Sequence, residues 1–164
     1  MAHSTQTKNL NNTKAHEVLQ IVSFNLGEED FGVDILKVQE INRMANITRV
    51  PNTPDYVEGV INLRGKVIPI IDLRVRFGMN RKERDNSTRI VVVEYAGKIV
   101  GFVVDAVREV LRVPTDIMEP PPKLIANVAA DYIEAVGKFE NRILILLNLD
   151  NILSAALVEV EEVV

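Results

Sequence analysis

The two halves of the chain carry matching residues in the same order, and this repeat limits the possible fold more than any other feature. One alignment of the second half on the first places Gly32 on Gly101 and VQEI (38–41) on VREV (107–110). A second alignment, with a slightly larger offset, matches YVEGVINLRGKVIPIIDL with YIEAVGKFENRILILLNL without a gap. Alternating apolar positions match by chance between any two β segments, so the inference depends on the glycine and polar matches. The sequence predicts an internal duplication, with halves at about 18–78 and 87–154.

The composition of each half indicates β-strands. Hydrophobic residues make up 47% of the chain, which is enough for a sizeable interior, and Trp is absent. Val, Ile and Leu dominate this fraction, and β-branched side chains favour strands. Each half holds about five short strands, a number that can close into a small barrel and protect its edges. We therefore expect a mainly β fold in which each half forms a barrel and the two barrels share an apolar seam. The repeat-equivalent valines Val38 and Val107 are expected to line a groove where the barrels meet.

Local patterns predict several shorter features. Thr53 is a candidate cap for a short helix, because the proline after it suits the first helical position. Pro69 cannot donate a backbone hydrogen bond, so Val67–Ile71 is expected to be an edge strand or to bend at a bulge. A turn at Glu140–Asn141 is expected to close the last hairpin, and Leu149–Leu153 to form a short helix.

The two ends of the chain are expected to be tails around a folded domain at 17–154. Residues 1–16 are polar and lack periodicity, which predicts a flexible N-terminal tail, and 155–164 form a C-terminal tail. The N-terminus has no apolar core of a signal peptide. No apolar run reaches the roughly 18–20 residues that cross a bilayer. A cytoplasmic location without direct membrane insertion is therefore expected.

The residues that carry chemistry are few and scattered. With no cysteine there is no disulfide and no thiolate site, and both histidines, His3 and His16, lie in the tail, so neither a metal nor a cofactor is expected. Asp72, Asp105 and Glu109 are candidates for paired carboxylates, but capping of a short helix explains Asp72. No common nucleophile, metalloprotease, phosphate-loop or dinucleotide motif occurs. The sequence therefore predicts a binding module rather than an enzyme.

The charge of the chain excludes one class of partner. The net charge is −4, and the basic residues are scattered along the sequence. A surface that tracks phosphates needs a contiguous positive stripe. Nucleic acid is therefore not expected as a partner.

One segment places a cation where a structural role does not require it. EGVINLRGKVIPIIDL holds two apolar runs joined by Arg64, Gly65 and Lys66. Glycine accepts the positive φ of a tight turn, which predicts a hairpin but does not explain the arginine at its tip. Such an arginine is either simply solvated or takes part in a binding surface. The residues alone leave both interpretations open.

Four segments match one family pattern in order and without large gaps. They are FGVDILKVQEI (31–41), NTPDYVEGVINLRGKVIPIIDLR (52–74), VGFVVDAVREVL (100–111) and NRILILLNLDNIL (141–153). The block NLRG-x-x-x-P-x-x-D-L-R is the most specific of them. From about residue 17 to residue 154, the chain resembles the CheW-like family of scaffold proteins of bacterial chemotaxis.

The resemblance implies both a fold and a function. The implied fold is two intertwined five-stranded barrels of the Src-homology-3 type that share a hydrophobic core, with short helices. The implied function is a non-enzymatic adaptor that couples methyl-accepting chemoreceptors to the histidine kinase CheA. Such an adaptor binds the regulatory domain of CheA and holds the cytoplasmic tip of the receptor in the inter-barrel groove. It is recruited to membrane-bound receptor arrays.

The resemblance also implies site residues. Those of the receptor-binding groove are Val38, Glu40, Gly59, Arg64 and Val107. Arg64 is expected to project toward the groove, and Gly59 to let a partner's backbone approach closely. Those of the kinase or ring interface are Arg43, Ile47, Val50, Met118, Glu119 and Leu124. Some relatives carry a basic residue in place of Glu119, so the contact there is expected to differ.

Two other functions fit the same residues. One is a CheW-like adaptor in a non-chemotactic kinase pathway, such as surface motility. The other is a small-ligand-binding barrel or an enzyme that uses the groove. A pocket of converging polar side chains with perturbed pKa values would favour the second.

Overall fold

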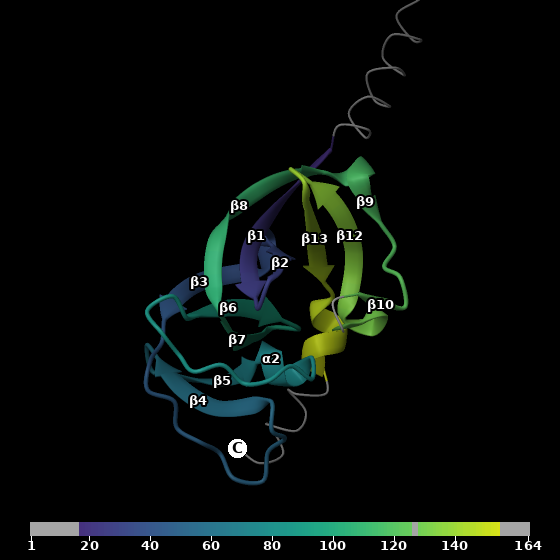
Figure 1. The fold of residues 1–164 in the computed structure, drawn as a ribbon. Helices are drawn as coiled ribbons and strands as arrows, with labels where there is room; N and C mark the ends of the chain where they lie inside the picture. The colour runs from purple at the N-terminus through teal and green to yellow at the C-terminus, as the bar shows by residue number, and fades with distance from the viewer. Residues whose placement is uncertain (1–16, 126–127, 155–164) are drawn as a thin grey trace, which may run out of the picture.

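The computed structural model describes residues 17–125 and 128–154 (Figure 1). The tails predicted at 1–16 and 155–164 lie outside the described residues. The described chain is mainly β, as the sequence predicts, and its helices are short. No helix in these two ranges is long and apolar enough to cross a membrane.

The long strands of the two halves correspond to one another. The first half contributes β1 (Val18–Leu26), β2 (Glu29–Asp34), β3 (Val38–Arg43), β4 (Val57–Leu63) and β5 (Lys66–Asp72). The second half contributes β6 (Arg89–Tyr95), β7 (Lys98–Val104), β8 (Ala106–Pro114), β12 (Ile133–Phe139) and β13 (Arg142–Leu147). Shorter elements are η1 (Ile35–Lys37), α2 (Leu73–Arg76), η2 (Thr115–Ile117), β9 (Met118–Glu119), β10 (Leu124–Ile125), β11 (Val128–Ala129) and η3 (Ala130–Tyr132). The second of the two sequence alignments carries β4 onto β12 with matching first and last residues.

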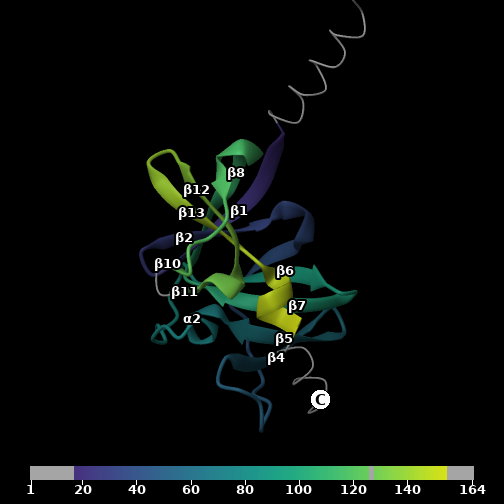
Figure 2. The ribbon, with the colours of Figure 1, turned by 90° about the vertical axis from the view of Figure 1, so that its right-hand side faces the viewer.

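The strands of the two halves are exchanged between the two main sheets. The upper sheet in Figures 1 and 2 has the order β8-β1-β2-β13-β12-β9, and the lower sheet has the order β3-β6-β7-β5-β4. We call these the upper and the lower barrel. Each barrel therefore combines the first two long strands of one half of the sequence with the last three long strands of the other half. The expectation that each half closes its own barrel is wrong, whereas the intertwined Src-homology-3-like barrels implied by the family resemblance are present.

The exchange joins the halves through parallel strand pairs, which a hairpin cannot make. Strand β13 pairs with β2, placing Leu146 opposite Gly32, and β5 pairs with β7, placing Ile70 opposite Gly101. A Cβ atom on Gly32 would lie 2.3 Å from Ile21, and one on Gly101 would lie 2.7 Å from Ile70. The glycine match between the halves therefore has a packing cause, because both glycines make room for isoleucine side chains.

Apolar side chains form a core inside each barrel and a third core between them. The upper interior contains Ile21, Leu111, Val113, Leu144 and Leu146, and the lower interior contains Ile61, Ile68, Ile70, Ile90, Val92 and Val103. The shared core takes residues from both sheets, and rings of Phe24, Phe31, Phe102, Phe77 and Tyr132 lie at centroid distances of 5.5 to 6.2 Å along it. Each fully buried Val, Leu or Phe contributes roughly 1.5–3 kcal/mol. The shared core therefore stabilises the barrels as one unit.

The helix predicted at Thr53 is absent from the described residues. The chain forms turns there, and β4 begins at Val57. The hydroxyl of Thr53 donates to the carbonyl of Val50 at 2.9 Å, so it bonds backward along the chain instead of accepting the N–H of a following helical turn. The helix expected at Leu149–Leu153 is confirmed, because 149–154 are helical.

Strand β5 lies inside the lower sheet, so the expectation of an edge strand at Pro69 is wrong. The strand has β7 on one side and β4 on the other. The pairing with β7 begins only at Ile70, so the missing N–H of Pro69 interrupts no bond on that side. The bulge that the sequence offered as an alternative lies on the partner strand, between Val57 and Gly59.

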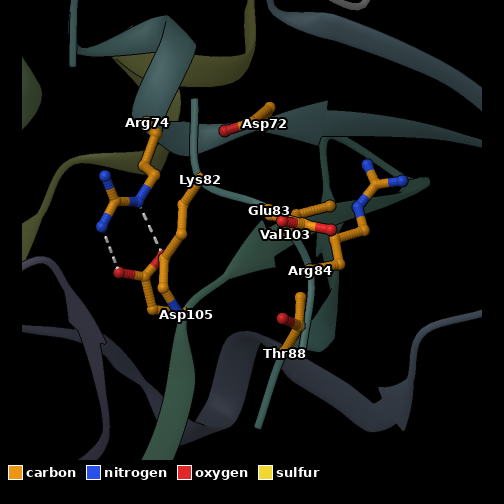
Figure 3. A pocket seen from close by; sticks show the side chains of 8 residues that line it. All are labelled: Asp72, Arg74, Lys82, Glu83, Arg84, Thr88, Val103 and Asp105. Atoms are coloured by element: carbon orange, nitrogen blue, oxygen red, sulfur yellow. Dashed lines mark hydrogen bonds and ion pairs between the residues drawn. The ribbon is translucent and has the colours of Figure 1, made fainter. Parts of the chain in front are cut away.

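A half-buried ion pair ties the two barrels together where the chain passes from β7 to β8. The carboxylate of Asp105 accepts hydrogen bonds from Arg74 Nε at 2.8 Å and Nη2 at 2.5 Å (Figure 3). It also accepts the backbone N–H of Gly27 at 2.7 Å. Arg74 belongs to α2, which follows the lower strand β5, whereas Gly27 lies in the β1–β2 turn of the upper barrel. Burial alone would raise the pKa of Asp105, but these donors hold it below its ordinary value.

Candidate functional site

The repeat-equivalent valines both rest on the shared core. Val38 lies opposite Val93 on β6, and Val107 lies opposite Phe24 on β1. Residues opposite each other on neighbouring strands point to the same face, and Val93 and Phe24 both belong to the shared core. The structure therefore places Val38 and Val107, both half-buried, on the side between the barrels.

Glu40 and Arg64 lie on the other side of β3 and pair with each other. Glu40 is opposite Val92, whose side chain belongs to the interior of the lower barrel. Arg64 Nη2 is 2.5 Å from Glu40 Oε2, and the two side chains are 74% and 22% exposed. The hydrogen bond from Arg64, followed by one from Asn42, holds the pKa of Glu40 below its ordinary value. The guanidinium is thus engaged within the chain, on a different face from the two valines.

The β4–β5 turn determines where this guanidinium lies. Arg64 has φ of 52° and Gly65 has φ of 82°, so two successive residues adopt the left-handed region that a tight two-residue hairpin requires. The N–H of Gly65 donates to Asn62 Oδ1 at 2.9 Å, which closes the turn. The predicted hairpin is therefore confirmed, and it holds Arg64 beside the edge strand β3.

The Glu40–Arg64 pair lies at the rim of a hollow at one end of the lower barrel. The hollow is lined by Gln39, Glu40, Leu63, Arg64, Lys66, Ile68, Val92 and Ile99. Its aliphatic residues belong to the interior of the barrel or pack against it, and its charged residues come from the hairpin and from β3. An apolar centre with a charged rim is typical of protein-binding surfaces.

The upper barrel contains an equivalent ion pair. Glu109 occupies the position of Glu40 in the second half, and its carboxylate lies 3.3 Å from Arg142 Nη2. Arg142 occupies the position of Lys66 rather than that of Arg64. Each barrel therefore pairs the glutamate of its edge strand with a cation from its closing hairpin, but only the lower barrel takes this cation from the tip of the turn.

Gly59 is buried, and the backbone that approaches it belongs to this chain. A Cβ atom there would lie 2.1 Å from the carbonyl oxygen of Thr48. Thr48 exchanges two backbone hydrogen bonds with Val60, at 2.8 and 2.9 Å, where the chain after β3 crosses β4. The expectation that Gly59 makes room for a partner's backbone is therefore wrong, because the residue lies inside the fold and φ of 144° also favours glycine.

The kinase-interface residues predicted in the first half lie on and after β3. Arg43 is exposed at the end of the strand. Ile47 is half-buried against the interior of the lower barrel. Val50 lines a hollow formed by 49–55 and 57. Arg43 and Val50 therefore lie at the surface, whereas Ile47 also stabilises the barrel.

The predicted residues in the second half lie around β9 and β10. Met118 is half-buried against the interior of the upper barrel, and Glu119 is exposed. Glu119 lines a hollow together with Val136 and Ile143, which is 50% exposed. Leu124 begins β10, which pairs with β11. This part of the upper barrel thus presents an apolar surface beside an acidic residue.

Sequence reasoning missed two exposed aliphatic residues on the edge strands. Ile41 on β3 is 40% exposed, and Val110 on β8 is 51% exposed. They are equivalent in the repeat, as are the exposed pair Val67 and Ile143. The alignment that pairs Val38 with Val107 could have identified Ile41 and Val110, but their exposure depends on strand register.

The three carboxylates considered for acid–base chemistry all have structural partners. Asp72 caps α2, Glu109 pairs with Arg142, and Asp105 is held by Arg74. Asp72 and Asp105 line one small polar cavity (Figure 3), but Glu109 is not part of it. In the part of the chain that the structure describes, no group of three or more His, Cys, Asp or Glu side chains could hold a metal ion.

Comparisons with known proteins agree with this architecture. A family model, the CheW-like domain, matches residues 20–157. The chemotaxis protein CheW of Klebsiella aerogenes is 40% identical over 136 residues, which cover 83% of this chain and 82% of the relative. The chemotaxis protein CheW of Helicobacter pylori is 40% identical over 138 residues, covering 84% and 82%. The crystal structure of the scaffolding protein TtCheW from Thermoanaerobacter tengcongensis has a TM-score of 0.76 at 39% identity and covers 81% of this chain and 86% of its own. This chain therefore belongs to the CheW-like family.

Proposed function

We propose that this chain is a non-enzymatic adaptor that couples methyl-accepting chemoreceptors to the histidine kinase CheA in bacterial chemotaxis. The observation that carries the proposal is the family match, which extends over both barrels. The exchanged strands and the shared core support it physically, because they join two barrels into one body with several exposed surfaces. The protein acts in the cytoplasm, at membrane-bound receptor arrays.

The receptor tip binds on the side between the barrels. Val38 and Val107 rest there on the shared core and bury the apolar stripe of a receptor helix. The Glu40–Arg64 pair lies on the opposite face of β3, which is an edge strand, and it contacts the receptor beyond that edge with both charges in place. Charged groups at the rim of an interface set orientation and partner choice more than affinity, so this pair aligns the receptor.

The regulatory domain of CheA binds elsewhere on the barrels. On the lower barrel it contacts the region around Arg43, Ile47 and Val50. Of these residues, Arg43 and Val50 lie at the surface. A second contact, which joins adaptor and kinase into rings, involves Met118, Glu119 and Leu124. The apolar hollow beside Glu119 supports this assignment, since the centre of a protein interface is apolar and its rim is polar.

Amide-shift mapping tests both assignments. The isotopically labelled chain is titrated separately with a receptor-tip fragment and with the regulatory domain of CheA. We expect the receptor fragment to shift signals around Val38 and Val107, and the kinase domain to shift signals around Arg43 and Val50. If a saturating amount of either partner shifts no amide signal of the labelled chain, the adaptor proposal is overturned. If the two partners shift the same signals, the separation of the two surfaces is overturned.

Charge-swap variants test the role of the ion pair. Arg64→Glu and Glu40→Arg are each expected to weaken binding of the receptor fragment without changing the melting temperature, because the pair lies at the surface. The double variant restores an ion pair with exchanged ends. If the receptor recognises the positions of both charges, the double variant also binds weakly. Normal binding by Arg64→Glu would show that the pair takes no part.

A further inference from the structure

Arg76, the last residue of α2, contacts the rings of two tyrosines that are equivalent in the repeat. Its Cζ atom lies 4.5 Å from the centre of the Tyr56 ring and 5.0 Å from the centre of the Tyr132 ring. Both distances are within the range of a cation–π interaction. Its Nε donates to the carbonyl of Ile152, in the helix at 149–154, at 3.3 Å. One side chain thus joins three segments that lie far apart in the sequence.

The repeat shows that a helix at this place does not require an arginine. The alignment that carries Tyr56 onto Tyr132 also carries Arg76 onto Ile152. Ile152 is fully buried and belongs to the shared core. Because an aliphatic side chain serves at the equivalent position, helix formation and core packing do not account for the guanidinium of Arg76.

Tyr56 ends a loop, 49–56, that carries a residue of the proposed kinase surface, Val50. The loop borders a hollow, and none of its eight residues is buried. Two of its hydrogen bonds stay within the segment: the Thr53 hydroxyl donates to the carbonyl of Val50 at 2.9 Å, and the N–H of Val57 donates to the carbonyl of Pro54 at 3.0 Å. A loop with few buried contacts is positioned mainly by the bonds at its ends.

The bonds that tie this loop to the rest of the fold lie near its two ends. Just before the loop, Thr48 pairs with the backbone of β4. At its end, the carbonyl of Asp55 accepts Arg81 Nη2 at 2.8 Å, and the carbonyl of Tyr56 accepts the N–H of Asp72 at 2.7 Å. These carbonyl bonds fix two points of the backbone but leave the ring of Tyr56 to be held by other contacts.

Arg76 holds that ring against a part of the molecule that is fixed independently. The ring of Tyr132 also stacks on Phe77 of the shared core, at a centroid distance of 5.5 Å. The carbonyl of Tyr132 accepts the N–H of Asn148 at 2.9 Å. Tyr132 is therefore anchored without Arg76, and the guanidinium extends this anchoring to the ring of Tyr56.

We infer that Arg76 is a positioning residue for the kinase-binding loop 49–56. It acts through Tyr56, holding the end of the loop so that Val50 is already in place when the kinase domain binds. Such preorganisation raises affinity because less conformational freedom is lost on binding. The inference rests on the proposed function, in which the regulatory domain of CheA contacts Val50.

Replacing Arg76 by leucine tests this role. Arg76→Leu keeps an aliphatic side chain, as at Ile152, but removes both ring contacts. We expect the regulatory domain of CheA to bind about tenfold more weakly in titration calorimetry, the equivalent of two cation–π contacts. Binding of the receptor-tip fragment should not change. In the labelled chain without partners, the amides of Val50, Asn52 and Thr53 should show lower heteronuclear NOE values, which report faster motion of the loop.

Three further variants separate positioning from a loss of stability. Arg76→Lys should keep most of the kinase affinity, because an ammonium group also interacts with an aromatic ring face. Val113→Ala removes buried atoms from the upper interior, so it should lower the melting temperature and leave kinase affinity unchanged. Tyr56→Leu combined with Arg76→Leu should bind the kinase domain no more weakly than Tyr56→Leu alone, since both substitutions break the same contact.

The outcomes distinguish this inference from the proposed function. Wild-type kinase affinity in Arg76→Leu, equal weakening by Val113→Ala, or additive losses in the double variant would each overturn the positioning role, while kinase binding by the wild type would uphold the proposed function. If the wild type does not bind the regulatory domain, the proposed function fails. The NOE values then decide the structural part of the inference: a loop loosened by Arg76→Leu supports it, and an unchanged loop overturns it.

Discussion

Gly59 and Gly65 of the β4–β5 hairpin differ in the space that is available for a side chain. At Gly59, an added Cβ atom would collide with the carbonyl of Thr48, which is held in place by its bonds to Val60. At Gly65, φ is 82°, but among the described residues no atom outside Gly65 and its two chain neighbours lies within 4 Å of an added Cβ. The first position therefore combines a steric clash with an unfavourable φ, whereas the second has only the unfavourable φ.

This difference predicts unequal stability effects. Gly59→Ala should lower the free energy of unfolding by more than about 3 kcal/mol, because relief of the clash requires the Thr48 segment to move. Gly65→Ala should lower it by only about 1 kcal/mol, the usual cost of a left-handed alanine. Urea denaturation of both variants measures the difference. Similar losses for the two variants would contradict the assignment of Gly59 to the fold rather than to a surface.

Ser23 is a buried polar residue on strand β1 of the upper barrel. It is fully buried, and its hydroxyl has no hydrogen-bond partner in the part of the chain that the structure describes. The equivalent residue in the other half is Val92. Ser23→Ala should therefore raise the free energy of unfolding, by about 1 kcal/mol, because it removes an unsatisfied buried group.

A buried hydroxyl that does have a partner is the matched control for Ser23. Thr88 Oγ1 accepts the N–H of Asp85 at 3.0 Å, so Thr88→Val should lower the free energy of unfolding by about 1 kcal/mol. Thermal and urea unfolding of both variants measure whether each substitution raises or lowers the free energy of unfolding. A loss of stability in Ser23→Ala would mean that the Ser23 hydroxyl is satisfied.

At the residue scale, local sequence identified equivalent positions but not pairings across the fold. Val38 and Val107 follow from the repeat, and the structure places both on the shared core. The pair of Glu40 and Arg64 does not follow, because the two lie far apart in the sequence and only the ordering of strands brings them together. The burial of Gly59 depends in the same way on the segment that crosses β4.

At the element scale, hairpins were more predictable than the neighbours of each strand. The turn at Glu140–Asn141 is closed by two residues with positive φ, a property of the local sequence. The environment of Pro69 depends on β7, which begins far along the chain and lies beside β5 only in the folded sheet. Alternating apolar residues predict a strand but do not identify its partners.

The ion pair of Asp105 with Arg74, where the chain passes from β7 to β8, predicts a pH-dependent stability. The folded-state pKa of Asp105 is lowered, so its bonds to Arg74 and Gly27 stabilise the fold fully above the unfolded-state pKa of about 3.9. That contribution is lost as the pH falls through the lower, folded-state pKa. Asp105→Asn should therefore lower the free energy of unfolding by about 2 kcal/mol at pH 7, and the gap to the wild type should narrow below about pH 4.

Asp72→Asn is the matched control for this variant. Burial raises the pKa of Asp72, so the fold disfavours its charge, and stability from this group increases as the pH falls. Asn148 occupies the equivalent position and accepts the N–H of Asn151 at 3.2 Å, so an asparagine can also cap here. Asp72→Asn should change the free energy of unfolding little at pH 7. Equal losses for the two variants would contradict the specific role of Asp105.

For the whole molecule, the duplication predicts two barrels but not which strands form each. Because the halves are equivalent, β1 and β2 present nearly the same apolar pattern as β6 and β7. Either pair could complete either barrel while burying similar side chains, so hydrophobic pattern alone does not distinguish the exchanged arrangement from the separate one. The parallel pairs β2–β13 and β5–β7 show the exchanged arrangement directly.

The exchange predicts that neither half of the chain folds alone. Fragments 1–80 and 81–164, divided within the polar connector between α2 and β6, each lack strands from both barrels. Each fragment should therefore be unfolded by circular dichroism, and an equimolar mixture should regain the β spectrum and a single melting transition. The uncut chain with a Gly-Ser insertion at the same point is the control, and it should stay folded because the connector is exposed there. A cooperative transition in either isolated fragment would mean that a barrel forms without the exchanged strands, and the shared core would then not be required for folding.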